Sequence, residues 1–64
     1  MSVGAKIKEF RLERGYTQED IAEKLNVSRS YLANIERGVK VPNVILAGEI
    51  ADILEVTVDS LLGR

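Results

Sequence analysis

Apolar residues recur along this chain at intervals of three and four positions, which is the spacing of one face of an α-helix. Five such segments can be read, and no stretch alternates apolar and polar residues for long enough to predict a strand. We also expect no internal repeat. The pattern predicts an all-α fold, a compact bundle of five short helices. The expected inward positions of the first three helices are Val3, Ile7 and Phe10; Ile21, Ala22 and Leu25; and Leu32 and Ile35.

Residues with strong capping preferences separate these segments. Thr17 precedes Asp20 by three positions, which is the arrangement of a capping box at the start of the second helix. Ser28 and Asn43 are suitable N-caps for the third and fourth helices. Asn26 tolerates left-handed backbone geometry, so we expect a tight turn there. The glycines expected to follow the first, third and fifth helices are Gly15, Gly38 and Gly63.

The stretch from Gln18 to Ile35 has the pattern of two helices joined by a short turn. Helices that cross at a steep angle need a small residue where they touch, and Ala22 meets that need. An apolar seam would hold the angle, and its members are Ile21, Leu25, Val27, Leu32 and Ile35. We therefore predict a helix-turn-helix over residues 17–37, within a single domain of residues 1–64.

Four segments carry a family resemblance, namely Ile7–Arg11, Gly15–Ala22, Ser28–Gly38 and Val56–Leu62. Together they resemble the Cro/C1-type (Xre-family) helix-turn-helix repressors, and the likeness extends over about residues 5–62. It implies a lambda-repressor-like domain that places its third helix in the major groove of double-stranded DNA. The segment Ser28–Tyr31 is similar to that of restriction–modification controllers, although this short match leaves phage repressors open as well.

The resemblance implies two sets of DNA contacts. Base edges would be faced by Ser28, Arg29, Ser30, Tyr31 and Asn34, and phosphates by Thr17, Gln18, Arg37 and Lys40. Arg29 suits guanine, because its guanidinium fork matches the O6 and N7 acceptors, and Asn34 suits adenine. The alternatives are capping alone for Thr17, packing against its neighbours for Tyr31, and solvated surface positions for the arginines, Lys40 and Asn34.

Arg11 and Glu36 have a different implied role. Arg11 follows Phe10 on a helix whose apolar face points inward, and Glu36 follows Ile35. The family pairs these two positions in a partly buried salt bridge between the first and third helices. We therefore expect Arg11 to stabilise the fold and not to contact DNA.

The fourth helix carries apolar residues around most of its circumference, which is typical of a helix buried on more than one side. The stripe expected to face the core is Val44, Ala47, Gly48, Ala51 and Leu54. The apolar surface would spread further through Ile45, Leu46, Ile50 and Ile53, with Gly48 admitting the close approach of another helix. A homodimer interface is therefore predicted, with the candidates Val41, Ile45, Leu46, Val58 and Leu61. The alternative is one generous core with a few exposed aliphatic residues.

The charge and composition limit the class of partner. A net charge of −1 argues mildly against a nucleic-acid partner. Residues 1–40 nevertheless carry eight basic and six acidic side chains, a balance of +2, while residues 41–64 carry one basic and four acidic, a balance of −3. A basic front can still attract DNA. The chain lacks Cys and His, which excludes disulfides and nearly all zinc chemistry. No apolar run approaches the ~20 residues of a membrane-spanning helix. We therefore expect a cytoplasmic, nucleoid-associated protein without metal, cofactor, membrane span or enzymatic activity.

These observations predict a sequence-specific transcriptional regulator, in the first place a repressor, that binds an inverted-repeat operator as a homodimer. The recognition helices of such a dimer lie about 34–36 Å apart, which is one turn of the duplex. The alternative function is a protein-interaction or antirepressor module that keeps the fold without binding DNA, and the net negative charge is its best support.

Overall fold

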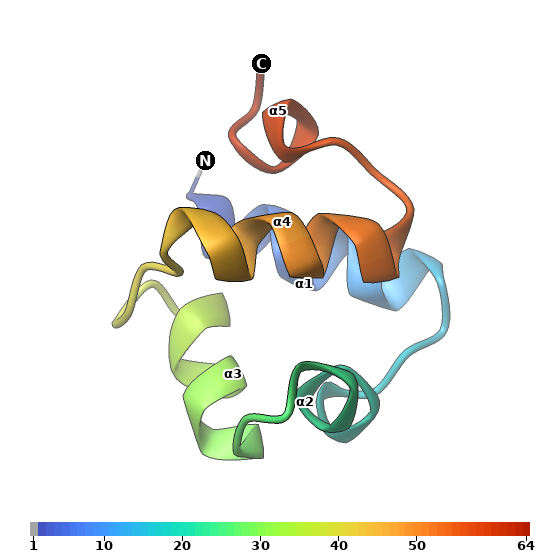
Figure 1. Ribbon diagram of the computed structural model, residues 1–64, viewed down its shortest axis with the longest axis vertical. Coiled ribbons are helices and arrows are strands. Elements are labelled where there is room, and N and C mark those ends of the chain that lie inside the picture. The colour runs from blue at the N-terminus through green and yellow to red at the C-terminus, as the bar shows by residue number, and fades with distance from the viewer. Residues whose placement is uncertain (1) are drawn as a thin grey trace.

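The computed structural model describes residues 2–64; Met1, with which the predicted domain of residues 1–64 begins, lies outside them. Over these residues the chain forms helices and no strand, which confirms the predicted all-α class. In chain order the helices are α1 (Val3–Glu13), α2 (Gln18–Leu25), α3 (Arg29–Glu36), α4 (Val44–Leu54) and α5 (Val58–Leu61). Figure 1 shows α2 and α3 at one end of the molecule, and α5 with both chain ends at the other.

Each helix begins at a side chain that accepts a hydrogen bond from its own first turn. Thr17 accepts from the backbone N–H of Asp20 at 3.0 Å, and the Asp20 carboxylate accepts from the backbone N–H of Thr17 at 2.9 Å. This is the predicted capping box. The predicted caps Ser28 and Asn43 accept at 3.0 and 2.8 Å. A single N-cap stabilises a protein by about 1 kcal/mol. The remaining caps are Ser2 and Thr57.

The turn after α4 repeats the turn after α2. Asn26 has φ 59° and ψ 43°, as its residue type predicted, and Glu55 has φ 58° and ψ 41°. In both turns the next residue, a valine, donates its N–H at 3.0 Å to the carbonyl of the buried alanine five positions earlier. The matching segments, which share their apolar positions and caps but little else, are Ile21–Leu32 and Ile50–Leu61.

The core lies between the five helices, each of which contributes at least one buried apolar side chain. Its fully buried large side chains are Ile7, Ile21, Leu32, Ile35, Ile50, Leu54 and Leu61. Phe10 is only half-buried, and Val3 also packs at the edge of this cluster.

The face that α4 turns to the core differs from the prediction at the first residue of the helix and at one residue in its middle. Val44, expected inside, is 80% exposed, whereas Ile50, expected outside, is 0% exposed. The reason is positional, because Val44 is the first helical residue and lies beyond the elements that cover the middle of α4. Leu61, predicted to face a second subunit, is 1% exposed and belongs to the core. That assignment was wrong, because α5 folds back against α4 and α1. Leu61 is buried there, as Leu32 of α3 is after the turn at Asn26.

Two glycines within helices have opposite surroundings. A Cβ at Gly4 would lie 2.0 Å from the carbonyl oxygen of Ile35, so glycine is required for α1 to approach α3 this closely. A Cβ at Gly48 would meet nothing within 4 Å. The space beside Gly48 is open, and no other helix of this chain makes the close approach that was expected there. No helix among residues 2–64 is long and apolar enough to cross a membrane.

Candidate nucleic-acid interface

Helix α3 has a buried face and a polar edge. Leu32 and Ile35 are fully buried against the core. Ser28, Arg29 and Ser30 are exposed at the beginning of the helix. Figure 1 shows α3 beside α2 at one end of the molecule, with α5 and both chain ends at the other.

The other two residues predicted to face bases are half-buried. Tyr31 packs against the edge of the core and lines a groove of about 520 Å³ together with Leu46 and Glu49. The Asn34 side chain accepts a hydrogen bond through Oδ1 from the Arg37 guanidinium. A bidentate pair with adenine would use both this oxygen and the amide nitrogen, and the oxygen's second lone pair could accept from adenine while Arg37 stays bound.

The N-terminus of α2 presents backbone donors beside α3. The first N–H groups of a helix have no partner within it and attract anions.

The Asp20 carboxylate accepts the backbone N–H of Thr17, and this bond, followed by the one to the Thr17 side chain, lowers the pKa of Asp20 below its ordinary value of 3.8. The capping box therefore persists at neutral pH, and its contribution to stability is lost only as the pH falls through that lowered pKa.

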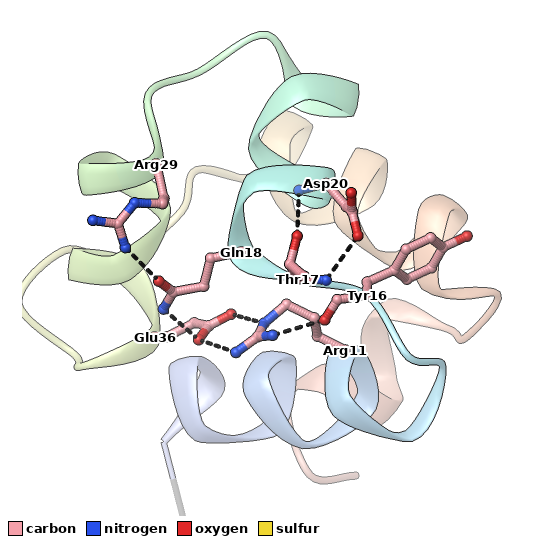
Figure 2. A network of polar contacts seen from close by, with 7 residues as sticks. All are labelled: Arg11, Tyr16, Thr17, Gln18, Asp20, Arg29 and Glu36. Carbon is pink, nitrogen blue, oxygen red and sulfur yellow. Dashed lines mark hydrogen bonds and ion pairs between the residues drawn. The ribbon is translucent and has the colours of Figure 1, made fainter.

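A polar network joins α1, α2 and α3 behind this surface, as Figure 2 shows. Arg11 donates to both carboxylate oxygens of Glu36, from Nε at 2.7 Å and from Nη2 at 3.1 Å. Its Nη1 donates to the carbonyl oxygen of Tyr16 at 2.8 Å. Both side chains of the ion pair are nearly inaccessible, at 7% and 2% exposure. Arg11 is thus unavailable to DNA and holds α3 against α1.

The network continues outward through Gln18. Its Nε2 donates to Oε1 of Glu36 at 3.1 Å, and its Oε1 accepts from Nη1 of Arg29 at 3.2 Å. Sequence reasoning assigned Gln18 to a phosphate and did not foresee this bridge. The spacing from the helix start would not have revealed it, because the partners lie eighteen and eleven positions away.

The residues after α3 place two cations on the surface. Arg37 and Lys40 are both exposed. The backbone N–H groups of Val39 and Lys40 donate to the Asn34 carbonyl oxygen, at 2.9 and 3.3 Å, which tightens the chain at the end of the helix.

Among residues 2–64 no group of three His, Cys, Asp or Glu residues could hold a metal ion.

The residues predicted to form a dimer interface do not share one surface. Val41 and Ile45 are strongly exposed, at 80% and 72%, whereas Leu46 and Val58 are half-buried and Leu61 is in the core. Four strongly exposed aliphatic residues lie between the end of α3 and the first turn of α4, and we call them the aliphatic patch. Its members are Val39, Val41, Val44 and Ile45.

These features define a class of protein, the helix-turn-helix domains, in which one helix holds a polar-edged second helix at the molecular surface. A match to the helix-turn-helix family covers residues 7–61. The chain belongs to this family, in its Xre or Cro/C1 type, which confirms the resemblance found in the sequence.

Three known proteins illustrate the similarity. The immunity repressor protein of Bacillus phage phi105 is 44% identical over 64 residues, which are 100% of this chain and 44% of the repressor. The master regulator for biofilm formation SinR, solved in complex with DNA, has a TM-score of 0.86 and 38% identity over 94% of this chain and 97% of that chain. The restriction-modification controller C.AhdI from Aeromonas hydrophila has a TM-score of 0.85 and 27% identity, over 92% and 89% of the two chains.

The chain spans about half the length of the curated relatives that it matches, which include ImmR and SinR of Bacillus subtilis. Those relatives carry the names of transcriptional regulators, in agreement with the prediction that this chain is not an enzyme.

Proposed function

We propose that this chain is a sequence-specific double-stranded-DNA-binding regulator of transcription, acting as a repressor from an inverted-repeat operator to which it binds as a homodimer. The observation that carries the proposal is the exposed polar edge of α3, whose opposite face is locked into the core by Leu32 and Ile35. An α-helix held in this way fits the major groove of B-DNA. The repressor role is supported by the similarity to a phage immunity repressor. Such a protein would work at the nucleoid, in the cytoplasm.

The proposed contacts divide between reading and positioning. Arg29 would read a base edge from the exposed start of α3, with Ser28, Ser30, Tyr31 and Asn34 around it. Thr17, Gln18, Arg37 and Lys40 would contact phosphates, which fix the register but do not carry sequence information. The acidic side chains of residues 41–64 are Glu49, Asp52, Glu55 and Asp59, and of these Glu49 lines the groove beside Ser28 and Tyr31.

The test begins with selection of bound duplexes from a random pool, followed by titration of the selected duplex at increasing salt. Because Arg37 and Lys40 would each neutralise a phosphate in both subunits, we expect a slope of log K against log salt of about −3 to −4. A protein-interaction module held by aliphatic contacts would show little salt dependence. Failure to select any sequence, with no binding at low salt, would contradict the proposal.

Arg29→Ala separates base reading from positioning. We expect it to weaken binding to the selected duplex by about 1–3 kcal/mol and to relax the preference at one base pair of each half-site. Lys40→Ala is the matched control, because the loss of a phosphate contact weakens all sequences alike and makes the salt slope shallower by about 1 per subunit. If Arg29→Ala preserves the full base preference, Arg29 is not the reader.

The homodimer is proposed to form through the aliphatic patch and not through Leu61. Ile45→Glu places a charge in the middle of the patch, and we expect it to convert dimers to monomers in sedimentation equilibrium. Leu12→Glu is the control, because Leu12 is an exposed aliphatic residue on α1, outside the patch, at 58% exposure against 72% for Ile45. An unchanged molecular weight for Ile45→Glu, or equal loss in both variants, would be evidence against this interface.

A further inference from the structure

We infer that a basic hollow between α1 and the last turn of the chain is a docking site for an acidic segment of a partner protein, in which carboxylates flank an apolar side chain. The hollow has a volume of about 610 Å³, and the residues that line it are Lys6, Phe10, Ser60, Leu62, Gly63 and Arg64. None of them belongs to the proposed DNA contacts. Figure 1 shows α5 and the C-terminus at the opposite end of the molecule from α2 and α3. The inference therefore goes beyond DNA binding and does not depend on it.

The hollow offers apolar surface that the chain itself does not cover. Phe10 is half-buried at the edge of the core, and Leu62 remains 45% exposed. An apolar side chain placed against these two residues would remove their remaining surface from water, which is the dominant favourable term in most protein–protein association. Aromatic residues and arginine are also enriched at such interfaces.

The wall of the hollow at the end of the chain is fixed by backbone hydrogen bonds. The N–H of Gly63 donates to the carbonyl oxygen of Ser60 at 3.2 Å, and the N–H of Arg64 donates to that of Asp59 at 2.9 Å. These bonds fold the last residues back onto α5. The backbone of Arg64 therefore has a defined place beside the hollow.

Three cations lie around the apolar surface. Lys6 and Arg14 are four positions before and after Phe10, with Nζ of Lys6 at 5.9 Å and Cζ of Arg14 at 6.0 Å from the ring centroid. Arg64 is the third. Within residues 2–64 neither arginine takes part in an ion pair, and the pair of Lys6 with Glu9 is long, at 4.0 Å. No acidic residue lines the hollow, so these cations can bind carboxylates of a partner, which arginine binds bidentately.

Two other occupants are less compatible with this chemistry. A two-fold dimer sets the same patch of both subunits against itself, which would bring the three cations towards their own copies. A nucleic-acid backbone offers phosphates to the cations but little apolar surface to Phe10 and Leu62. The combination of positive charge and an apolar floor thus favours a protein segment with both acidic and apolar side chains.

The test begins with selection of random dodecapeptides displayed on phage against the full chain. Peptides that also bind the Lys6→Gln, Arg14→Gln double variant are removed by counter-selection. We expect the enriched peptides to carry Asp or Glu residues next to an apolar residue. No enrichment, or enrichment of peptides without acidic residues, would overturn the inference.

The dissociation constant of an enriched peptide, measured by fluorescence anisotropy, then locates its site. Exposed ion pairs are individually weak, so the double variant should bind the peptide about 2- to 30-fold less tightly than the wild type. The matched control is the variant Lys8→Gln, Lys24→Gln, which removes the same charge from exposed positions outside the hollow and should change binding by less than about 2-fold. Equal losses in both variants would mean attraction by net charge alone and would contradict a site. Circular dichroism verifies that both variants are folded.

Duplex binding and self-association distinguish the other occupants. The Lys6→Gln, Arg14→Gln variant should bind the selected duplex to within about 2-fold of the wild type, and the duplex should not displace the peptide. Displacement, or a loss of duplex binding in this variant, would assign the hollow to nucleic acid. A lower molecular weight of the variant in sedimentation equilibrium would assign it to a second copy of the chain, and either result overturns the inference. A wild-type protein that selects no duplex contradicts the proposed function and leaves the peptide measurement intact.

Discussion

Replacing Arg11 by methionine is expected to lower the free energy of unfolding by about 3–5 kcal/mol, because removal of one partner leaves a buried charge uncompensated. The Glu36 carboxylate would keep only the Gln18 amide as a hydrogen-bond donor from this network. A domain of this size has a total stability of about 3–10 kcal/mol, at roughly 0.05–0.15 kcal/mol per residue. Urea denaturation followed by circular dichroism should therefore find Arg11→Met largely unfolded, or unfolding at much lower urea concentrations.

Two further variants show that the uncompensated charge is the cause. Arg14→Met removes an exposed guanidinium from the C-cap of the same helix. The Cζ atom of Arg14 lies 6.0 Å from the centroid of the Phe10 ring. Loss of this contact should lower the free energy of unfolding by no more than about 1 kcal/mol. The pair Arg11→Met with Glu36→Leu removes both charges and should recover most of the lost stability. Equal effects of Arg11→Met and Arg14→Met would show that the ion pair does not stabilise α3 against α1.

The second large effect is expected in α4. Ile50→Ala should lower the free energy of unfolding by about 2–5 kcal/mol, because Ile50 is fully enclosed and its truncation leaves a cavity. Val44→Ala should change it by less than about 0.5 kcal/mol, because exposed positions lose little on truncation. Both are measured at protein concentrations where the chain is monomeric, so that the proposed dimerisation does not contribute.

The comparison decides which face of α4 is inside. The hydrophobic pattern alone assigned Val44 to the core and Ile50 to the outer surface, and the reverse is found in the structure. A greater loss of stability for Val44→Ala than for Ile50→Ala would restore the assignment made from the sequence and would place α4 differently on α1.

Features that depend on a few neighbouring residues could be predicted from the order of the amino acids. The caps at Thr17, Ser28 and Asn43 and the left-handed turn at Asn26 were all predictable, because capping and turn formation use local hydrogen bonds. The apolar seam of the helix-turn-helix was equally clear, since α2 and α3 are joined by a short turn that brings their inner faces together.

Features that depend on elements far apart in the chain could not be predicted from the sequence and became visible in the folded structure. Residue type does not predict a left-handed Glu55, and spacing does not reveal that Gly4 must lie against the Ile35 carbonyl. In α4 nearly every position is apolar, so the periodicity cannot select a face, and the packing of α1, α2 and α5 around the helix selects it. The same holds for Gln18, whose type suits both a phosphate and a side-chain bridge. Its orientation follows from Glu36, eighteen positions away and brought near only by folding.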